Sequence, residues 1–170
     1  WKLAIENYHE CWHCPIIHPD LERRTASTTG EYLDDQVGAW VGGTMRFSAG
    51  VESMTVSGGR IGRRLRGAAT GDRMGERVAY VGLFPNLLLA FHPDYVLTHR
   101  IEPVSPGRST VTCEWLVPPD TASNAGFDPG DAVDFWDQVN RQDWAAVESV
   151  QRGVSSPLYR QGPLGVVEDD

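Results

Sequence analysis

The sequence predicts an α+β fold: an antiparallel β-sheet meander followed by a long C-terminal helix. Four short runs of mostly apolar, β-branched and aromatic residues lie at 78–84, 87–92, 95–103 and 110–117, and each is separated from the next by a turn that contains proline. Short strands joined by tight turns pair antiparallel. After a Pro/Asp/Gly-rich connection, Asp128-Pro129 is a typical helix start and Gly153 a typical helix end.

The remaining elements are predicted from proline, glycine and residue alternation. Residues 1–14 predict a helix that Pro15 ends, because the residue before a proline avoids the helical conformation. Residues 15–36 predict an irregular segment, and residues 38–57 have a strand-like pattern. Residues 58–77 are rich in glycine and arginine and predict a surface loop.

The composition of the chain limits the classes of function that it can have. A chain of 170 residues fits one domain, and 15 Lys+Arg against 23 Asp+Glu give a net charge of −8. Acidic chains are poorly suited to nucleic acid or anionic lipid, and no apolar run approaches the roughly 18 residues of a membrane helix. Three cysteines without a secretory signal predict free thiols in a reducing cytoplasm.

One carboxylate lies on the apolar side of the predicted C-terminal helix. With 100° per residue, Asp143 falls within the stripe formed by Trp136, Val139 and Val147, whereas Asp134 and Glu148 fall outside it. A buried carboxylate is costly unless it is paired or bound to a metal. Asp143 is therefore predicted to be either a salt-bridge partner or a metal ligand.

Residues 6–18 hold three histidines, two carboxylates and two cysteines. On a helix Glu10 and His13 share a face, and the break at Pro15 allows His18 to return towards His13. Two imidazoles and a distant carboxylate, such as Asp143, form the two-histidine, one-carboxylate set that holds Fe(II) with open positions.

Other interpretations of this segment stay open. His9-Glu10-Cys11-Trp12-His13 matches the H-E-x-x-H pattern of zinc metallohydrolases, although only eight residues precede it. Cys11 and Cys14 form a C-x-x-C without the second pair of a structural zinc site, and we interpret them as thiols packed beside the site. A metal-free module that binds an apolar ligand is a further alternative.

Two separated blocks carry a family resemblance. The first runs from Trp1 to Pro19, and the second from Gln142 to Leu164 with Gln151-Arg152-Gly153 and Gly162-Pro163-Leu164. Together they resemble the catalytic domain of the α subunit of Rieske non-heme iron ring-hydroxylating oxygenases. The resemblance implies a helix-grip, START-like arrangement in which the sheet wraps the C-terminal helix.

The resemblance also implies residue roles. His13, His18 and Asp143 would bind Fe(II), and Glu10 would link His13 to a Rieske [2Fe–2S] cluster in a neighbouring subunit. Asn7 would lie near the iron.

The implied reaction is O2-dependent hydroxylation of a small organic substrate, with electrons from a ferredoxin or reductase. The expected substrate is an aromatic hydrocarbon or another small organic compound, the alternative is a quaternary ammonium compound, and mono- or dioxygenation stays open. The expected assembly is a homotrimer. The aromatic residues that either line the pocket or belong to the core are Tyr80, Phe84, Phe91, Tyr95 and Trp136.

A Rieske centre needs two Cys–His pairs in paired spacing, and this sequence lacks that set. We therefore expect residues 1–170 to be a single mononuclear-iron catalytic domain, with the Rieske domain upstream. We expect no turnover from this chain alone.

Overall fold

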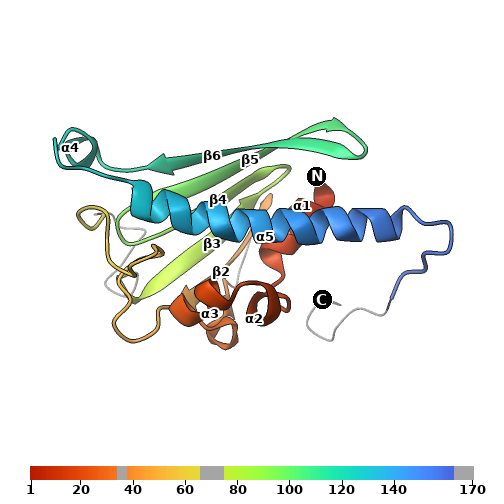
Figure 1. Cartoon of the computed structure of the whole chain (residues 1–170), viewed down its shortest axis with the longest axis horizontal. Helices are drawn as coiled ribbons and strands as arrows, with labels where there is room; N and C mark the ends of the chain where they lie inside the picture. The colour runs from red at the N-terminus through yellow and green to blue at the C-terminus, as the bar shows by residue number, and fades with distance from the viewer. Residues whose placement is uncertain (34–37, 66–74, 163–170) are drawn as a thin grey trace.

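Six strands form one antiparallel sheet in which each strand pairs with the next along the chain (Figure 1). The computed structural model describes residues 1–33, 38–65 and 75–162. Within these residues the strands are β1 (Glu31–Tyr32), β2 (Trp40–Arg46), β3 (Arg77–Leu83), β4 (Leu87–Phe91), β5 (Val96–Ser105) and β6 (Arg108–Leu116). The predicted α+β class is confirmed, and the four predicted strands correspond to β3–β6 within two residues at each end.

The long helix α5 (Gly130–Val154) crosses one face of this sheet (Figure 1). Its buried side chains, including Phe135, Trp136 and Val139, belong to the same apolar core as Leu97 of β5. Asp128 Oδ1 accepts a hydrogen bond from the backbone N–H of Gly130 at 2.8 Å, which satisfies a free donor at the helix start. The predicted start is thus confirmed within a residue, and the helix passes Gly153 to end one residue later.

The N-terminal segment forms three short helices instead of one. They are α1 (Lys2–His9), α2 (Cys14–Ile17) and α3 (Pro19–Arg24). The prediction that a helix continues to residue 14 is wrong, because Glu10 has extended backbone angles and ends α1. Pro15 lies in the first turn of α2, where its fixed φ suits a helix and its missing N–H costs nothing.

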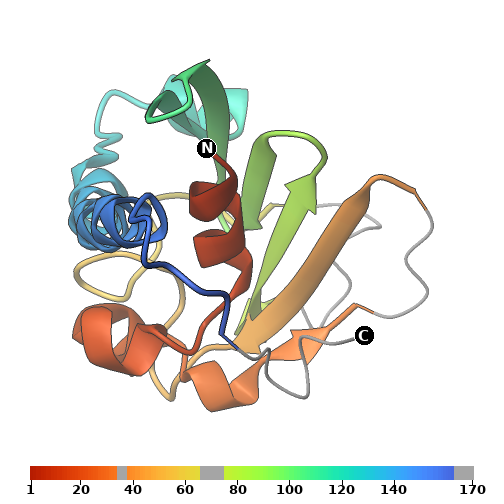
Figure 2. The ribbon, with the colours of Figure 1, turned by 90° about the vertical axis from the view of Figure 1, so that its right-hand side faces the viewer.

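Helix α1 lies between α5 and the sheet (Figure 2). Its His9 ring packs directly on Gly82 of β3, where any side chain would overlap it. This close approach lets α1 settle against the sheet while its other side faces α5. The residues that follow His9 are thereby directed towards the middle of α5.

The segment after β2 is a loop that places several buried side chains in the core, so the strand predicted over residues 38–57 is wrong beyond Arg46. Gly50 and Gly58 have φ values of +82° and +79°, which turn the chain where other residues are strained. Met54 is fully buried in this loop, and its carbonyl oxygen accepts a hydrogen bond from Tyr95 Oη at 2.6 Å. The loop therefore closes one end of the core.

Shorter elements complete the described chain: the 3-10 helix η1 (Ser27–Thr29) and helix α4 (Pro119–Ala122). Part of the predicted arginine-rich loop, residues 66–74, lies outside the described residues, as do Pro163 and Leu164 of the second sequence block. The described part of the loop is anchored by an ion pair between Arg63 and Asp120 of α4, 2.7 Å apart.

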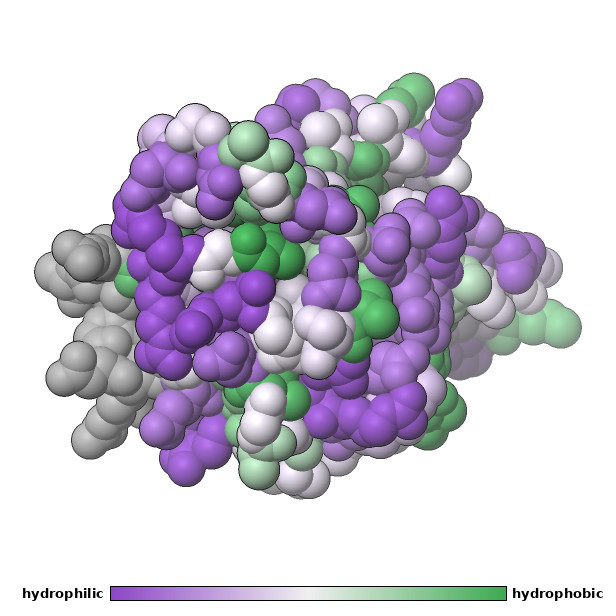
Figure 3. Space-filling view, turned by 60° about the vertical axis from the view of Figure 1, so that its left-hand side comes forward, coloured by the Kyte–Doolittle hydropathy of each residue, from purple (hydrophilic) through white to green (hydrophobic). Residues whose placement is uncertain are grey.

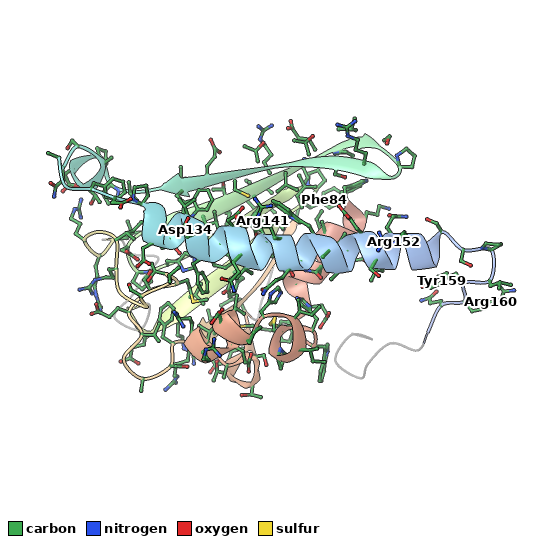
Figure 4. The ribbon with its side chains drawn as sticks, in the orientation of Figure 1. Phe84, Asp134, Arg141, Arg152, Tyr159 and Arg160 are labelled. Carbon is green, nitrogen blue, oxygen red and sulfur yellow. A yellow bond between two sulfur atoms is a disulfide. The ribbon has the colours of Figure 1, made fainter. Side chains whose placement is uncertain are left out.

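The surface is polar on the face that Figure 3 shows, with only small scattered apolar patches. Figure 4 shows three charged side chains along α5, Asp134, Arg141 and Arg152, and all three are exposed. In the described parts of the chain, no helix combines the length and apolarity that a membrane span requires.

Candidate metal centre

The four-residue helix α2 holds His13 and His18 at its two ends. His13 is its N-cap residue, and His18 is both its C-cap residue and the N-cap residue of α3. Pro15 and Pro19 start the two short helices, so the chain turns sharply at His18. The two imidazole rings meet edge to face, with their centroids 5.1 Å apart.

Asp143 of α5 lies beside both rings. Its Oδ1 atom lies 2.8 Å from Nε2 of His18 and 3.3 Å from Nε2 of His13. One potential ligand atom from each of the three residues lies within 4.8 Å of the others. His18 is only 2% exposed, whereas the side chains of His13 and Asp143 are 15% and 23% exposed, so the group lies mostly below the surface.

The outward nitrogens of both rings have separate acceptors. Nδ1 of His13 lies 3.2 Å from Glu10 Oε2, and Nδ1 of His18 lies 2.8 Å from Gln142 Oε1. Glu10 is also held in place because its Oε1 accepts a hydrogen bond from the backbone N–H of Trp12. With Nδ1 engaged outward, Nε2 of each ring is the nitrogen that faces the centre of the group.

Asn7 of α1 completes the surroundings of the carboxylate. Its Nδ2 donates a hydrogen bond to Asp143 Oδ1 at 2.7 Å. Burial alone would raise the pKa of Asp143, but its contacts with His13 and His18 and the hydrogen bond from Asn7 lower that pKa to about 2. The hydrogen bond with Asp143 raises the pKa of His13, against the opposing effect of burial, and Glu10 adds to the rise. The group is thus built around a carboxylate that stays ionised.

The residues fit a divalent iron ion. Two neutral imidazole nitrogens and one carboxylate are the donor set of non-heme Fe(II) oxygenases, which keep open positions for dioxygen and substrate. Three potential ligand atoms lie close together, and the outer nitrogen of each imidazole ring has a hydrogen-bond acceptor. This arrangement is typical of metal-binding histidines.

Sequence reasoning located Asp143, His13, His18, Glu10 and Asn7, and the structure brings all five together. It gave no role to Gln142. The available signal was its place directly before Asp143, in the second sequence block, but which side chain it meets depends on how α3 packs against α5.

The zinc-hydrolase interpretation is not supported. That site needs both histidines one turn apart on a single helix. Here α1 ends at His9, whose Nε2 is buried against β3 and has no hydrogen-bond partner among the described residues. His9 is also absent from the group of potential ligands found in the described chain.

The prediction of free thiols at Cys11 and Cys14 is wrong. The structure joins them in a disulfide that encloses Trp12 and His13 in a small loop. A C-x-x-C spacing is compatible with a thiol pair and with a disulfide, and nothing in the sequence decides between them. Cys113 is free, and burial raises the pKa of its thiol to about 11.

A small cavity of about 40 Å³ opens beside Asp143, between α1, α5 and the sheet. Its polar and aromatic lining is Asn7, Tyr8, His99, Asn140, Asp143 and Trp144. Of the aromatic residues predicted for a pocket, Tyr95 and Trp136 are buried in the core and joined by a 2.8 Å hydrogen bond. Phe84 is 77% exposed at the β3–β4 turn. Tyr95 and Trp136 thus belong to the core, which the sequence left open as the alternative, and none of the five aromatic residues named from the sequence is part of this cavity's lining.

The whole chain, residues 1–170, matches the family described as "Ring hydroxylating alpha subunit (catalytic domain)". The chain belongs to this family. Its members are Rieske oxygenases, which use a mononuclear iron and a Rieske [2Fe–2S] cluster and receive electrons from a reductase or ferredoxin. The predicted family is thereby confirmed, and the predicted enzyme class and cofactors are those of its members.

Curated relatives in the family are monooxygenases. The chain is 30% identical to the glycine betaine monooxygenase oxygenase subunit of Chromohalobacter salexigens, over 96% of this chain and 42% of that protein. It is 27% identical to the chloroplastic choline monooxygenase of Arabidopsis thaliana, over 99% of this chain and 36% of that protein. The chain thus spans less than half the length of these relatives.

Solved structures give the same fold. The quaternary ammonium Rieske monooxygenase CntA, in complex with an inhibitor, aligns with a TM-score of 0.67 and 19% identity, over 94% of this chain and 38% of that one. A complex of CntA with γ-butyrobetaine aligns with a TM-score of 0.61 and 20% identity, over 94% of this chain and 36% of that one. These relatives lend no support to the expectation of aromatic-hydrocarbon catabolism or of dioxygenation.

Proposed function

We propose that this chain is the iron-binding domain of a Rieske monooxygenase that oxidises a quaternary ammonium compound. The observation that carries the proposal is the convergence of His13, His18 and Asp143 within 4.8 Å, with both outer ring nitrogens engaged. These three side chains would hold Fe(II), which supplies reductive activation of dioxygen when bound.

The chain's own residues position and protect this chemistry. Asn7 orients the Asp143 carboxylate, and Glu10 holds the His13 ring. Burial of His18 and the apolar sides of the cavity, including Leu88, exclude bulk water from the reacting centre. Glu10, whose side chain is 35% exposed, is the group through which an electron from the Rieske cluster would reach His13.

The relatives and the cavity lining support the choice of substrate class. The lining includes two aromatic side chains, Tyr8 and Trp144, of the kind whose π-faces can attract a cation. In the described parts of the chain, the cavity lining includes no lysine or arginine. Relatives named for glycine betaine and choline support this choice over an aromatic hydrocarbon.

The proposed enzyme also needs a Rieske cluster and a neighbouring subunit, which residues 1–170 do not supply. The [2Fe–2S] cluster would lie in an upstream Rieske domain, because the sequence lacks the required two Cys–His pairs. The electron would cross from a neighbouring subunit of a homotrimer in the cytoplasm. One atom of dioxygen would enter a C–H bond of the substrate and the other would leave as water, with two electrons from the donor and two protons from solvent.

Metal binding is tested by anaerobic reconstitution of the full-length polypeptide with Fe(II), followed by metal analysis. We expect one mononuclear iron per chain beyond that in the cluster. His18→Ala should abolish it and His9→Ala should retain it. Loss of the metal in His9→Ala with retention in His18→Ala would instead favour the zinc-hydrolase site.

Substrate class is tested with the reconstituted enzyme, its reductase and a panel of compounds. Glycine betaine and choline should stimulate oxygen uptake with stoichiometric product formation, whereas benzoate and toluene should not. The opposite order would return the aromatic substrate and contradict the quaternary ammonium assignment.

A further inference from the structure

Both ring nitrogens of His18 face oxygen atoms from two consecutive residues of α5. Nε2 lies 2.8 Å from Asp143 Oδ1, and Nδ1 lies 2.8 Å from Gln142 Oε1. Consecutive side chains on a helix diverge by about 100°, so the imidazole is held between the two. One short stretch of α5 thus contacts the ring of His18 at both nitrogens.

We infer that Gln142 is a positioning residue that prepares His18 for metal binding. The carbonyl oxygen of an amide accepts hydrogen bonds and cannot donate them, so Nδ1 of His18 carries the hydrogen. The lone pair available to a metal then lies on Nε2, which faces Asp143 and His13. The inference rests on the proposed iron site and adds a residue to it.

The two histidines are held by chemically different acceptors. His13, whose side chain is 15% exposed, faces the carboxylate of Glu10, whereas His18, which is 2% exposed, faces the neutral amide of Gln142. Glu10 and Gln142 are both half-buried. Either acceptor can fix the tautomer of its ring, because each takes the hydrogen on Nδ1.

The test measures Fe(II) and Co(II) affinity by chelator competition under anaerobic conditions, with the full-length polypeptide. Gln142→Met keeps the length of the side chain and removes the acceptor, so affinity should fall about 10- to 100-fold. Gln142→Glu keeps an acceptor and removes the donor, so affinity should stay within a few-fold of the unaltered protein. The Co(II) absorption spectrum should be perturbed in Gln142→Met and preserved in Gln142→Glu.

Gln138 provides a matched control on the same helix. It lies one turn earlier, is exposed, and donates a hydrogen bond to Asp20 at 2.8 Å, away from the site. Gln138→Met should leave metal affinity unchanged. Thermal unfolding of the metal-free proteins should give similar midpoints for Gln138→Met and Gln142→Met, because the proposed role concerns metal binding and not the fold.

Unchanged affinity in Gln142→Met would overturn the inference. So would equal losses in Gln142→Met and Gln142→Glu, since that result would assign the effect to the amide N–H or to the neutral charge of the side chain, and not to the acceptor oxygen. If Gln142→Met does not fold, Gln142→Glu decides by itself, because loss of metal there excludes an acceptor role. Failure of the unaltered protein and of Gln138→Met to bind either metal would overturn the proposed function and this inference with it.

Discussion

Glu10 and His13 are joined by a contact of 3.2 Å between carboxylate Oε2 and ring Nδ1, at the nitrogen opposite the one that faces Asp143. The carboxylate is partly exposed and the far side of the ring belongs to the candidate metal centre. A single imidazole thus spans the distance from solvent to the group of potential ligands. The electron path proposed above, through Glu10 and His13, would use this contact.

Glu10→Gln should separate metal binding from electron delivery. An amide oxygen still accepts a hydrogen bond from Nδ1, so the His13 ring and the iron content should be retained, while the bridging negative charge is lost. Product formation in the reconstituted enzyme should fall at least about tenfold. The measurement is iron content together with single-turnover product yield. Glu6→Gln, an exposed change one turn earlier on α1, is the control, and loss of iron in Glu10→Gln would assign that residue to metal retention instead.

Asn7→Leu should weaken metal binding while leaving the fold intact. The Asn7 amide donates to Asp143 Oδ1 at 2.7 Å, and its removal frees the carboxylate to rotate away from the two rings. We expect Co(II) affinity to fall about tenfold, the usual cost of losing an outer hydrogen bond to a metal ligand. Asn124→Leu, at an exposed turn, is the control and should leave the Co(II) affinity unchanged. Equal affinity in Asn7→Leu would show that the rings and α5 alone fix Asp143.

The site could be predicted from sequence where periodicity and side-chain chemistry point the same way. Asp143 could be predicted because a carboxylate within an apolar helical stripe needs a partner. The structure supplies that partner, since both histidines contact Asp143 Oδ1. Strands β3–β6 were found because alternation and proline turns agree. At these positions the local conformational preference of the residues and their tertiary packing favour the same structure.

The predictions that proved wrong concern residue types that occur in two different kinds of local structure. Pro15 was interpreted as a helix end and starts α2 instead, since proline is favoured in a first turn. Val51 and Met54 suggest a strand, but their apolar side chains pack in the core from a loop that turns at Gly50 and Gly58. The role of Gln142 depends on contact with a residue 124 positions away, which no local pattern encodes.

Gly82→Ala should destabilise the domain through α1. A Cβ at this position would overlap the His9 ring, so α1 must move off β3 or the ring must rotate. We expect a loss of about 1–3 kcal/mol in the free energy of unfolding, the usual cost of overpacking. Urea unfolding provides the measurement, and Gly107→Ala, which meets nothing within 4 Å, is the control.

The double variant His9→Ala/Gly82→Ala tests the cause of that loss. If the His9 ring is the obstacle, removing it should recover part of the stability, and the two changes should be non-additive by at least about 0.5 kcal/mol. Strict additivity would show that Gly82 is required for a different reason, such as its fit within the strand.

His92 should make stability depend on pH in the mildly acidic range. It stacks on Tyr95 with ring centroids 4.2 Å apart, and neither ring nitrogen has a hydrogen-bond partner among the described residues. Burial, with a smaller contribution from His99, lowers the pKa of His92 to about 3. In the unfolded chain its pKa is about 6.5, so the unfolded state binds the proton more readily.

The contribution of His92 to stability is therefore complete above pH 6.5 and is lost progressively as the pH falls from 6.5 towards 3. By pH 5 the loss reaches about 2 kcal/mol, from 1.36 kcal/mol per pKa unit. Urea unfolding of the metal-free protein at pH 5 and pH 7.5 measures it. His92→Phe keeps an aromatic ring and removes the titrating group, so its stability should change less between these two pH values. Burial also lowers the pKa of His99, so part of the dependence will persist in this variant. If His92→Phe loses as much stability between pH 7.5 and pH 5 as the unaltered protein does, His92 can be protonated without leaving the core.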